Sequence, residues 1–188
     1  MTVPSHDEAT AILLGLDPPD WLVRHSAAVA EVAAFLASAA GEQGQPLDQG
    51  LVEAAALLHD IDKAPPLAEM REALGHGMAG ATWLAALGHP ELAPAVANHP
   101  VARLREDDAD EWLATASTEE LLVAYADKRA MAELVPMSER FDDWRRRYPD
   151  SSASVELGLA RALELERRAC ALAGVAPEQV ERVRWVAA

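Results

Sequence analysis

An apolar helical run that ends in charged residues constrains this chain more than any other feature. Residues 54–58 are alanine and leucine, and they lead directly into His59 and Asp60, with Lys63 three residues after the carboxylate. Polar groups carried into an interior in this way need partners, because burying them unpaired is costly. A cation is the simplest partner for an adjacent imidazole and carboxylate. We therefore predict a metal centre at this pair, with its remaining ligands supplied by the rest of the chain.

Composition and periodicity predict an all-α fold. Hydrophobic residues make up 51% of the 188 positions, aromatic residues only 5%, and few segments alternate with a period of two. Capping residues, prolines and glycines delimit about eight to ten helices, with Asp20 and Asp48 expected as caps. The expected helices cover residues 6–14, 21–39, 49–59, a short segment ending at 74, 78–87, 91–98, 118–134, 141–148, 151–173 and 177–186. Residues 103–110 are expected to form a surface loop or a frayed helix.

Charge and cysteine content exclude several classes of function. The formal net charge of −15 argues against binding to nucleic acid or to an anionic membrane. Cys170 is the single cysteine, so no intrachain disulfide can form, and a reducing, cytoplasmic setting is expected. The most apolar stretch, 21–40, contains Arg24, His25 and Glu31, so we expect neither export nor a membrane span.

Six polar side chains lie at apolar helix positions or at expected helix ends. They are His25, His59, Asp60, His76, His99 and Asp127. Four imidazoles and two carboxylates are enough for two transition-metal ions, with Asp60 as a bridge and open positions for water. Iron, manganese and zinc all accept these donors. Taken singly, His76 or His99 is better read as an ordinary hydrogen-bonded residue, whereas the adjacent His59–Asp60 pair favours a metal.

The chain has only two lysines, and each follows a candidate ligand. Lys63 lies three residues after Asp60, and Lys128 directly follows Asp127. An ammonium at such a position either binds a phosphate oxygen or offsets the carboxylates. We favour phosphate binding for Lys63 and keep Lys128 as a second candidate. Arg24 and Arg103 are further candidates for binding a polyphosphate, although solvated surface arginines are equally compatible with the pattern.

The order His25, His59-Asp60, Asp127 resembles that of the HD-domain metal-dependent phosphohydrolases. The motifs around these residues resemble the YqeK-type branch more closely. They are Arg24-His25-Ser26, His59-Asp60-x-x-Lys63, His76-Gly77-x-x-Gly80-Ala81, His99 with Arg103 four residues later, and Ala126-Asp127. That branch hydrolyses diadenosine tetraphosphate symmetrically to two ADP at a di-iron site. The resemblance implies that His25, His59, Asp60 and Asp127 hold one metal, and that Asp60, His76 and His99 hold the other.

One departure from that branch lies inside the central motif. Asp62 stands where a small residue usually precedes the lysine. It is either a partner to a ligand histidine or a solvated carboxylate.

The resulting hypothesis is a metal-dependent phosphohydrolase that acts on a nucleotide or dinucleoside polyphosphate. A metal-bridged hydroxide would be the nucleophile, with Asp60 and Lys63 as catalytic residues and iron as the favoured metal. Two alternatives remain open, namely a di-iron oxygenase of the same fold and a metal-stabilised nucleotide sensor without turnover. We expect residues 1–150 to form the HD-type domain. Residues 151–188 would form a helical extension that packs on the same domain or on a partner subunit of a homodimer.

Overall fold

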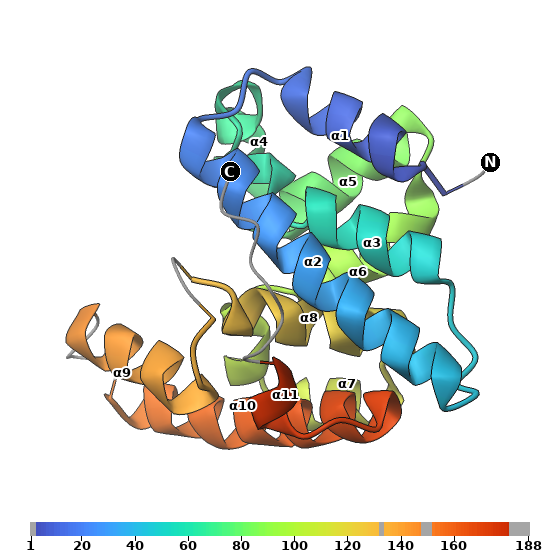
Figure 1. Ribbon diagram of the computed structural model, residues 1–188. Coiled ribbons are helices and arrows are strands. Elements are labelled where there is room, and N and C mark those ends of the chain that lie inside the picture. The colour runs from blue at the N-terminus through green and yellow to red at the C-terminus, as the bar shows by residue number, and fades with distance from the viewer. Residues whose placement is uncertain (1–2, 132–133, 148–151, 181–188) are drawn as a thin grey trace.

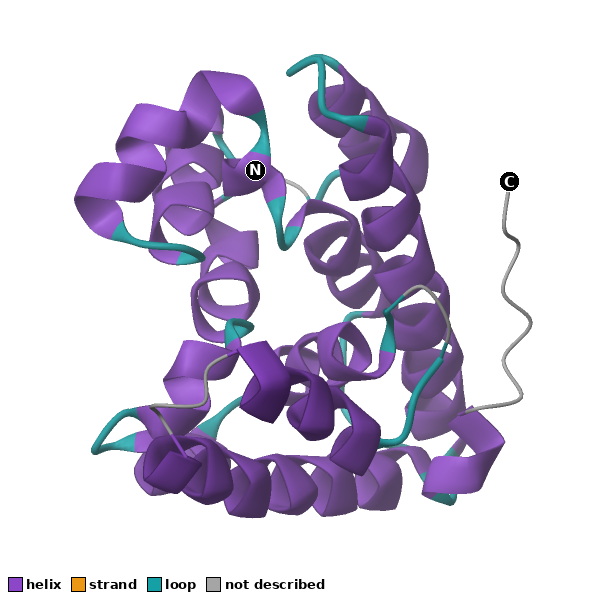
Figure 2. Cartoon of the chain, turned by 90° about the vertical axis from the view of Figure 1, so that its left-hand side faces the viewer, coloured by secondary structure: helices purple, strands orange, loops and turns teal. Residues whose placement is uncertain are grey.

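The structure, a computed structural model, describes residues 3–131, 134–147 and 152–180. Helices connected by loops make up this part of the chain, and no strand occurs in it (Figures 1 and 2). The α-helices are α1 (His6–Leu14), α2 (Asp20–Glu42), α3 (Gln49–Leu58), α4 (Ala68–Leu74), α5 (Met78–Leu87), α6 (Ala93–Asn98), α7 (Ala109–Thr115), α8 (Thr118–Arg129), α9 (Met137–Arg147), α10 (Ser152–Ala173) and α11 (Pro177–Val180). Four 3-10 helices lie between them: η1 (Ile61–Lys63), η2 (Pro65–Leu67), η3 (Pro90–Leu92) and η4 (Val101–Arg105). The predicted all-α class is confirmed.

Local capping explains why several helices begin where the sequence predicts. The Ser5 and Ser117 side chains accept hydrogen bonds from the backbone N–H groups of Glu8 and Glu120, which completes two capping boxes. Asp48 caps α3 by accepting from the Leu51 N–H. Each cap satisfies an N–H group that has no partner within its helix.

Four expectations about helix bounds need correction. Asp20 is the first residue of α2 and not its cap, since Pro19 holds the cap position without a side-chain hydrogen bond. Helix α7 begins at Ala109, inside the stretch 103–110 that we expect to be a surface loop or a frayed helix. Helix α8 ends at Arg129, five residues before the predicted end. Helix α9 starts four residues earlier than predicted; the predicted ends at 148 and 186 lie outside the described residues.

Helix α2 is the central element of the core. It packs against α3, α8 and α10, and Val29, Val32 and Leu36 on its buried face are inaccessible to solvent. By length and composition alone, α2 could cross a membrane. Half of its most apolar window is buried inside the fold, and the core helix of a soluble protein meets the same criteria.

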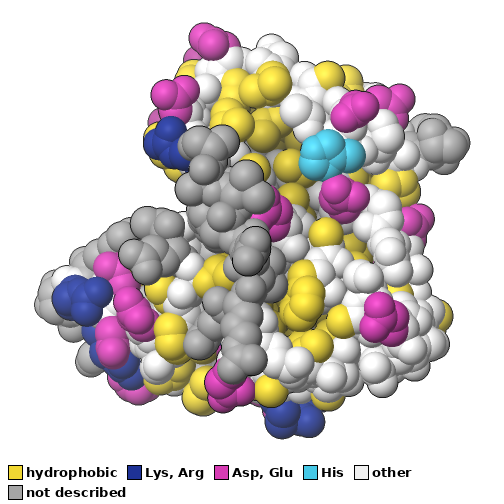
Figure 3. Space-filling view, in the orientation of Figure 1, with side chains coloured by type: hydrophobic (Ala, Val, Ile, Leu, Met, Phe, Trp, Pro, Cys, Tyr) yellow, Lys and Arg dark blue, Asp and Glu magenta, His cyan; other side chains and the backbone are white. Residues whose placement is uncertain are grey.

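The other helices lie on either side of α2. In Figure 1, α10 runs along the lower edge beneath α8, while α1, α4 and α5 lie towards the opposite end. Apolar side chains gather near α1 in the space-filling view (Figure 3), where a groove of about 380 Å³ lies between α1, α2 and α3. The six candidate ligands come from the middle of this assembly.

Candidate metal centre

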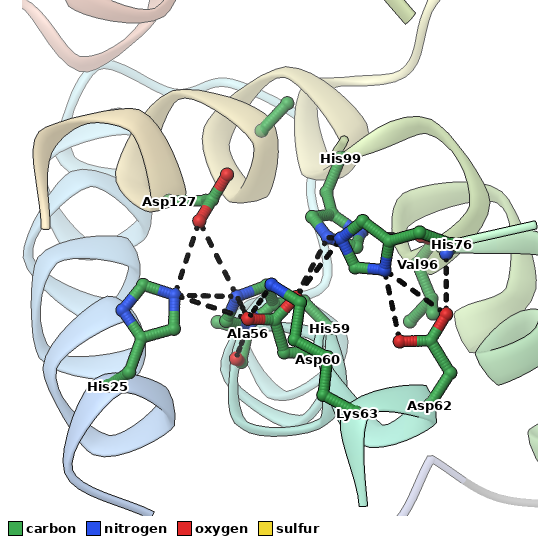
Figure 4. Close-up of polar contacts among 12 residues, drawn as sticks. His25, Ala56, His59, Asp60, Asp62, Lys63, His76, Val96, His99 and Asp127 are labelled. Carbon is green, nitrogen blue, oxygen red and sulfur yellow. Dashed lines mark hydrogen bonds and ion pairs between the residues drawn. The ribbon is translucent and has the colours of Figure 1, made fainter. Parts of the chain in front are cut away.

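Three helices bring four of the predicted ligands together. His25 comes from α2, His59 and Asp60 follow the last turn of α3, and Asp127 lies near the end of α8 (Figure 4). The Nε2 atoms of His25 and His59 are 3.2 Å apart. Asp60 Oδ2 lies 3.4 Å from each of these nitrogens. Asp127 Oδ1 lies 3.3 Å from His25 Nε2 and 3.6 Å from His59 Nε2. Each of the two carboxylates therefore lies within 3.6 Å of both histidine Nε2 atoms.

The other two histidines converge on the opposite oxygen of the same carboxylate. His76 lies in the turn between α4 and α5, and His99 follows the end of α6. Their Nε2 atoms are 3.2 Å apart, and each lies 3.3 Å from Asp60 Oδ1. Asp60 thus presents Oδ2 to the first cluster and Oδ1 to the second. Its position between the two clusters is that of a bridging ligand.

Distances and burial agree with a cation at each cluster. A metal bonded at about 2.0–2.2 Å to nitrogen and oxygen holds its ligand atoms roughly 3.0–3.5 Å apart. Asp60 Oδ1 is buried and has no hydrogen-bond partner among the described residues. His59 and Asp60 are inaccessible, and His99 is 1% exposed. Such groups need compensation, which two cations would supply.

Hydrogen bonds on the far side of the rings set the direction of the free nitrogens. His59 Nδ1 donates to the Ala56 carbonyl at 2.7 Å, and His99 Nδ1 donates to the Val96 carbonyl at 2.6 Å. A carbonyl can only accept, so Nδ1 carries the hydrogen in both rings. When either ring is neutral, its Nε2 lone pair faces the cluster, as metal ligation requires.

The Asp60 and Asp127 carboxylates stabilise positive charge on the groups around them. Burial raises the pKa of Asp60 and Asp127, but neighbouring histidines and lysines outweigh it and hold both values well below the usual range. Burial lowers the pKa of His59, but the charge of Asp60 and hydrogen bonding to Asp127 raise it to about 10. For His99 burial prevails and lowers the pKa to about 4. The raised pKa favours the protonated form of His59, so a cation at this cluster would compete with that proton.

The two lysines have different surroundings. Lys63 Nζ donates to Asp60 Oδ2 at 2.7 Å, and its side chain is 31% exposed. Lys128 is 1% exposed and donates to the carbonyls of His99 at 2.6 Å and Ala124 at 3.1 Å. Burial lowers the pKa of Lys128 to about 8, although the charge of the neighbouring Asp127 opposes this effect. Lys63 is thus partly exposed beside Asp60, whereas Lys128 is buried and its Nζ lies 3.6 Å from Asp127 Oδ2. The substrate-binding roles expected for the two lysines stay predictions.

The two arginines proposed for polyphosphate binding make no contact with the six ligands among the described residues. Arg24 is exposed on α2, next to His25. Arg103 donates to Asn98 and forms ion pairs with Glu106 and Asp108. Neither residue is held at the metal centre by a contact, so their substrate role stays a prediction.

Asp62 is not a solvated carboxylate. It is inaccessible to solvent, and it accepts hydrogen bonds from His76 Nδ1 at 3.0 Å and from the Gly77 N–H at 2.7 Å. Burial raises the pKa of Asp62, but these two hydrogen bonds lower it below its usual value. The sequence signal for this contact is an acidic residue placed two positions after a ligand carboxylate and beside an apolar run.

The HD domain family matches residues 22–132, which is more than half of the chain and includes all six candidate ligands. This chain belongs to the HD domain family. HD domains bind divalent metals and are generally hydrolases. In agreement with this, two groups of side chains could each hold a metal ion, namely His25, His59 and Asp60, and Asp60, His76 and His99. Neither the curated proteins nor the solved structures gave a match to this chain. The match begins in the first turn of α2 and ends after α8, so α1 and α9 to α11 lie outside the matched range.

Proposed function

We propose that this HD domain is a dinuclear metal-dependent phosphohydrolase that cleaves a nucleotide or a dinucleoside polyphosphate. The observation that carries the proposal is the position of Asp60, whose two oxygens each lie 3.3–3.4 Å from a separate pair of histidine Nε2 atoms. A carboxylate shared in this way is typical of two-metal sites that cleave phosphate esters and anhydrides. Resemblance to the YqeK-type branch suggests diadenosine tetraphosphate as the first substrate to test, with iron as the first metal.

Each cation would have its own set of ligands, with Asp60 shared between them. His25, His59, Asp60 and Asp127 would hold one cation, and Asp60, His76 and His99 the other. Two bound cations would lower the pKa of a coordinated water and offset negative charge on the phosphoryl oxygens.

Lys63 would act on the substrate directly. Its ammonium has three donors, one of which is directed to Asp60 at 2.7 Å, and its side chain is 31% exposed. A further donor can bind a phosphoryl oxygen and stabilise the charge that develops on the leaving oxygen. The buried rings of His59 and His99 exclude bulk water from the base of the site, which strengthens these interactions.

Metal analysis followed by a nucleotide panel tests the proposal. Protein purified without chelator would be assayed for bound iron, manganese and zinc, and then for release of phosphate and ADP from mono- and dinucleotides. We expect Asp60→Ala to lose bound metal and hydrolysis together while its circular dichroism stays helical. Asp110→Ala is the matched control, because Asp110 is an exposed carboxylate that pairs with Arg161. Full hydrolysis in Asp60→Ala would reject the proposal.

Two other outcomes would support the competing functions. Turnover that requires oxygen, measured against an anaerobic control, would indicate a di-iron oxygenase, since hydrolysis needs no oxygen. Thermal stabilisation by a nucleotide without any product, across all three metals, would indicate a sensing module.

A further inference from the structure

The Asp62 carboxylate lies beside the proposed metal centre but contacts the outer side of the His76 ring. It accepts from His76 Nδ1, whereas His76 Nε2 faces Asp60 and His99 (Figure 4). Asp62 Oδ2 accepts the Gly77 N–H at 2.7 Å and also lies 3.1 Å from His76 Nδ1. One buried carboxylate therefore holds both the side chain of His76 and the backbone directly after it.

His76 needs this support because it does not belong to a helix. His59 and His99 follow the ends of α3 and α6, and each donates Nδ1–H to the carbonyl three residues earlier. His76 lies in the turn between α4 and α5, where it makes no such contact among the described residues. Its side chain is also 33% exposed, against 1% for His99. Asp62 thus supplies the acceptor that a helical carbonyl supplies to the other two rings.

Two glycines allow the backbone after His76 to pack closely against neighbouring elements. Gly77 has a φ of +84°, and a Cβ there would lie 2.7 Å from Pro100 Cγ and 2.9 Å from the Ala97 carbonyl oxygen. A Cβ on Gly80 would approach Ile61 Cγ2 to 3.2 Å. The turn and the start of α5 can therefore approach η1 and α6 closely, which brings the Gly77 N–H within reach of Asp62.

We infer that Asp62 is a positioning residue that makes the second metal site, formed by Asp60, His76 and His99, competent to bind its ion. The inference rests on the proposed dinuclear centre. A carboxylate on Nδ1 fixes the tautomer and the orientation of the ring and makes Nε2 a stronger donor. Among the described residues, no hydrogen bond or ion pair links Asp62 to His25, His59 or Asp127, the three ligands that belong to the first site alone. Loss of Asp62 should therefore weaken metal binding at the second site and leave the affinity of the first site unchanged.

Titration of metal-free protein with Co²⁺ alone tests this inference. Calorimetry would give the stoichiometry and both affinities, and the visible spectrum would report the ligand environment of each ion. Asp62→Asn preserves size and leaves one oxygen that can accept from both donors, as Oδ2 does now. It removes the negative charge, however, and places an NH₂ donor where Oδ1 lies 3.0 Å from His76 Nδ1. We expect the second Co²⁺ to bind about 10- to 100-fold more weakly, with the first affinity unchanged. Asp62→Ala should show the same pattern, and so should His76→Ala.

The matched control is Asp110→Asn, an exposed carboxylate remote from the six ligands, which should bind two Co²⁺ like the wild type. Wild-type protein that binds a single Co²⁺ would overturn the dinuclear centre, and this inference with it. Wild-type protein that binds two, together with an Asp62→Asn variant that also binds two at unchanged affinity, would overturn the inference alone. Equal weakening of both sites in Asp62→Asn would also overturn it, because that result indicates a general loss of structure. Should Asp62→Ala fail to fold, Asp62→Asn decides the question.

Discussion

Two glutamates on α10 offer a test of what holds the C-terminal helices to the HD domain. Glu166 pairs with the guanidinium of Arg129 at 3.0 Å and accepts from the Tyr125 hydroxyl at 2.9 Å. Arg129 and Tyr125 are both inaccessible to solvent, and both belong to α8, which also carries Asp127. Glu164 pairs instead with Arg167 and Arg168, whose side chains are 66% and 33% exposed.

Removing the Glu166 carboxylate should destabilise the protein strongly. Breaking a buried ion pair costs about 3–5 kcal/mol, because the remaining charge stays buried. The lower end applies here, since Glu166 is 15% exposed and Arg129 still donates to the Val135 carbonyl at 2.6 Å. About 3 kcal/mol corresponds to a decrease in Tm of about 6–12 °C for a chain of this size. Glu164→Ala should cost less than about 1 kcal/mol, as exposed pairs do.

Urea denaturation followed by circular dichroism would measure both variants against the wild type. The reasoning is refuted if Glu166→Ala loses no more stability than Glu164→Ala. A Glu166→Gln variant, which keeps an acceptor for Tyr125 but not the charge, should fall between the wild type and Glu166→Ala.

Three further predictions concern the metal centre and its surroundings. The pKa of His59 is raised to about 10 without metal, so metal binding must displace its proton. The affinity for the metal should therefore rise about tenfold per pH unit between pH 6 and 8. Calorimetry in buffers of different ionisation enthalpy should detect about one proton released per metal bound at this cluster. Gly77→Ala should lower the free energy of unfolding by about 1–3 kcal/mol more than Gly44→Ala in urea denaturation, because both have positive φ but only Gly77 meets atoms within 3 Å. Lys63→Met should reduce kcat/KM for the nucleotide at least tenfold. Lys128→Met should leave KM within about twofold of the wild-type value. Equal effects of the two substitutions would contradict a substrate contact made by Lys63 alone.

Helix bounds were predictable wherever a local signal sets them. α1 and α5 match their predicted ranges, since a capping box begins one and glycines flank the other. The start of α7 was not predicted, because residues 103–110 are charged and have no clear period; the helix buries Trp112 and Leu113 against the rest of the fold. The end of α8 was missed for a similar reason, since Arg129 donates to Val135 across the following turn.

The candidate ligands were predictable as a set because polar residues at apolar helix positions need partners. Which oxygen of Asp60 faces which histidines could not be predicted, because that depends on the packing of four helices. Lys128 illustrates the same limit. Its position after Asp127 indicated the site, and its Nζ lies 3.6 Å from Asp127 Oδ2, but the hydrogen bond to the His99 carbonyl joins residues 29 positions apart and could not be predicted.

The end of α3 explains why adjacent residues can serve two metal sites. α3 ends at Leu58, His59 still has helical angles, and Asp60 leaves the helix with φ −100° and ψ 15°. In a continued helix, neighbouring side chains would diverge by about 100°, and Asp60 would be directed away from His59. The change of backbone direction at Asp60 instead brings Oδ2 next to His59 Nε2 and leaves Oδ1 for His76 and His99. α3 ends seven residues before Pro65, which leaves room for the 3-10 helix η1 after the change of backbone direction at Asp60. η1 contains Asp62 and places it against His76. The position at which α3 ends therefore determines the orientation of the bridging carboxylate, Asp60, and the placement of Asp62, which orients His76 in the second site.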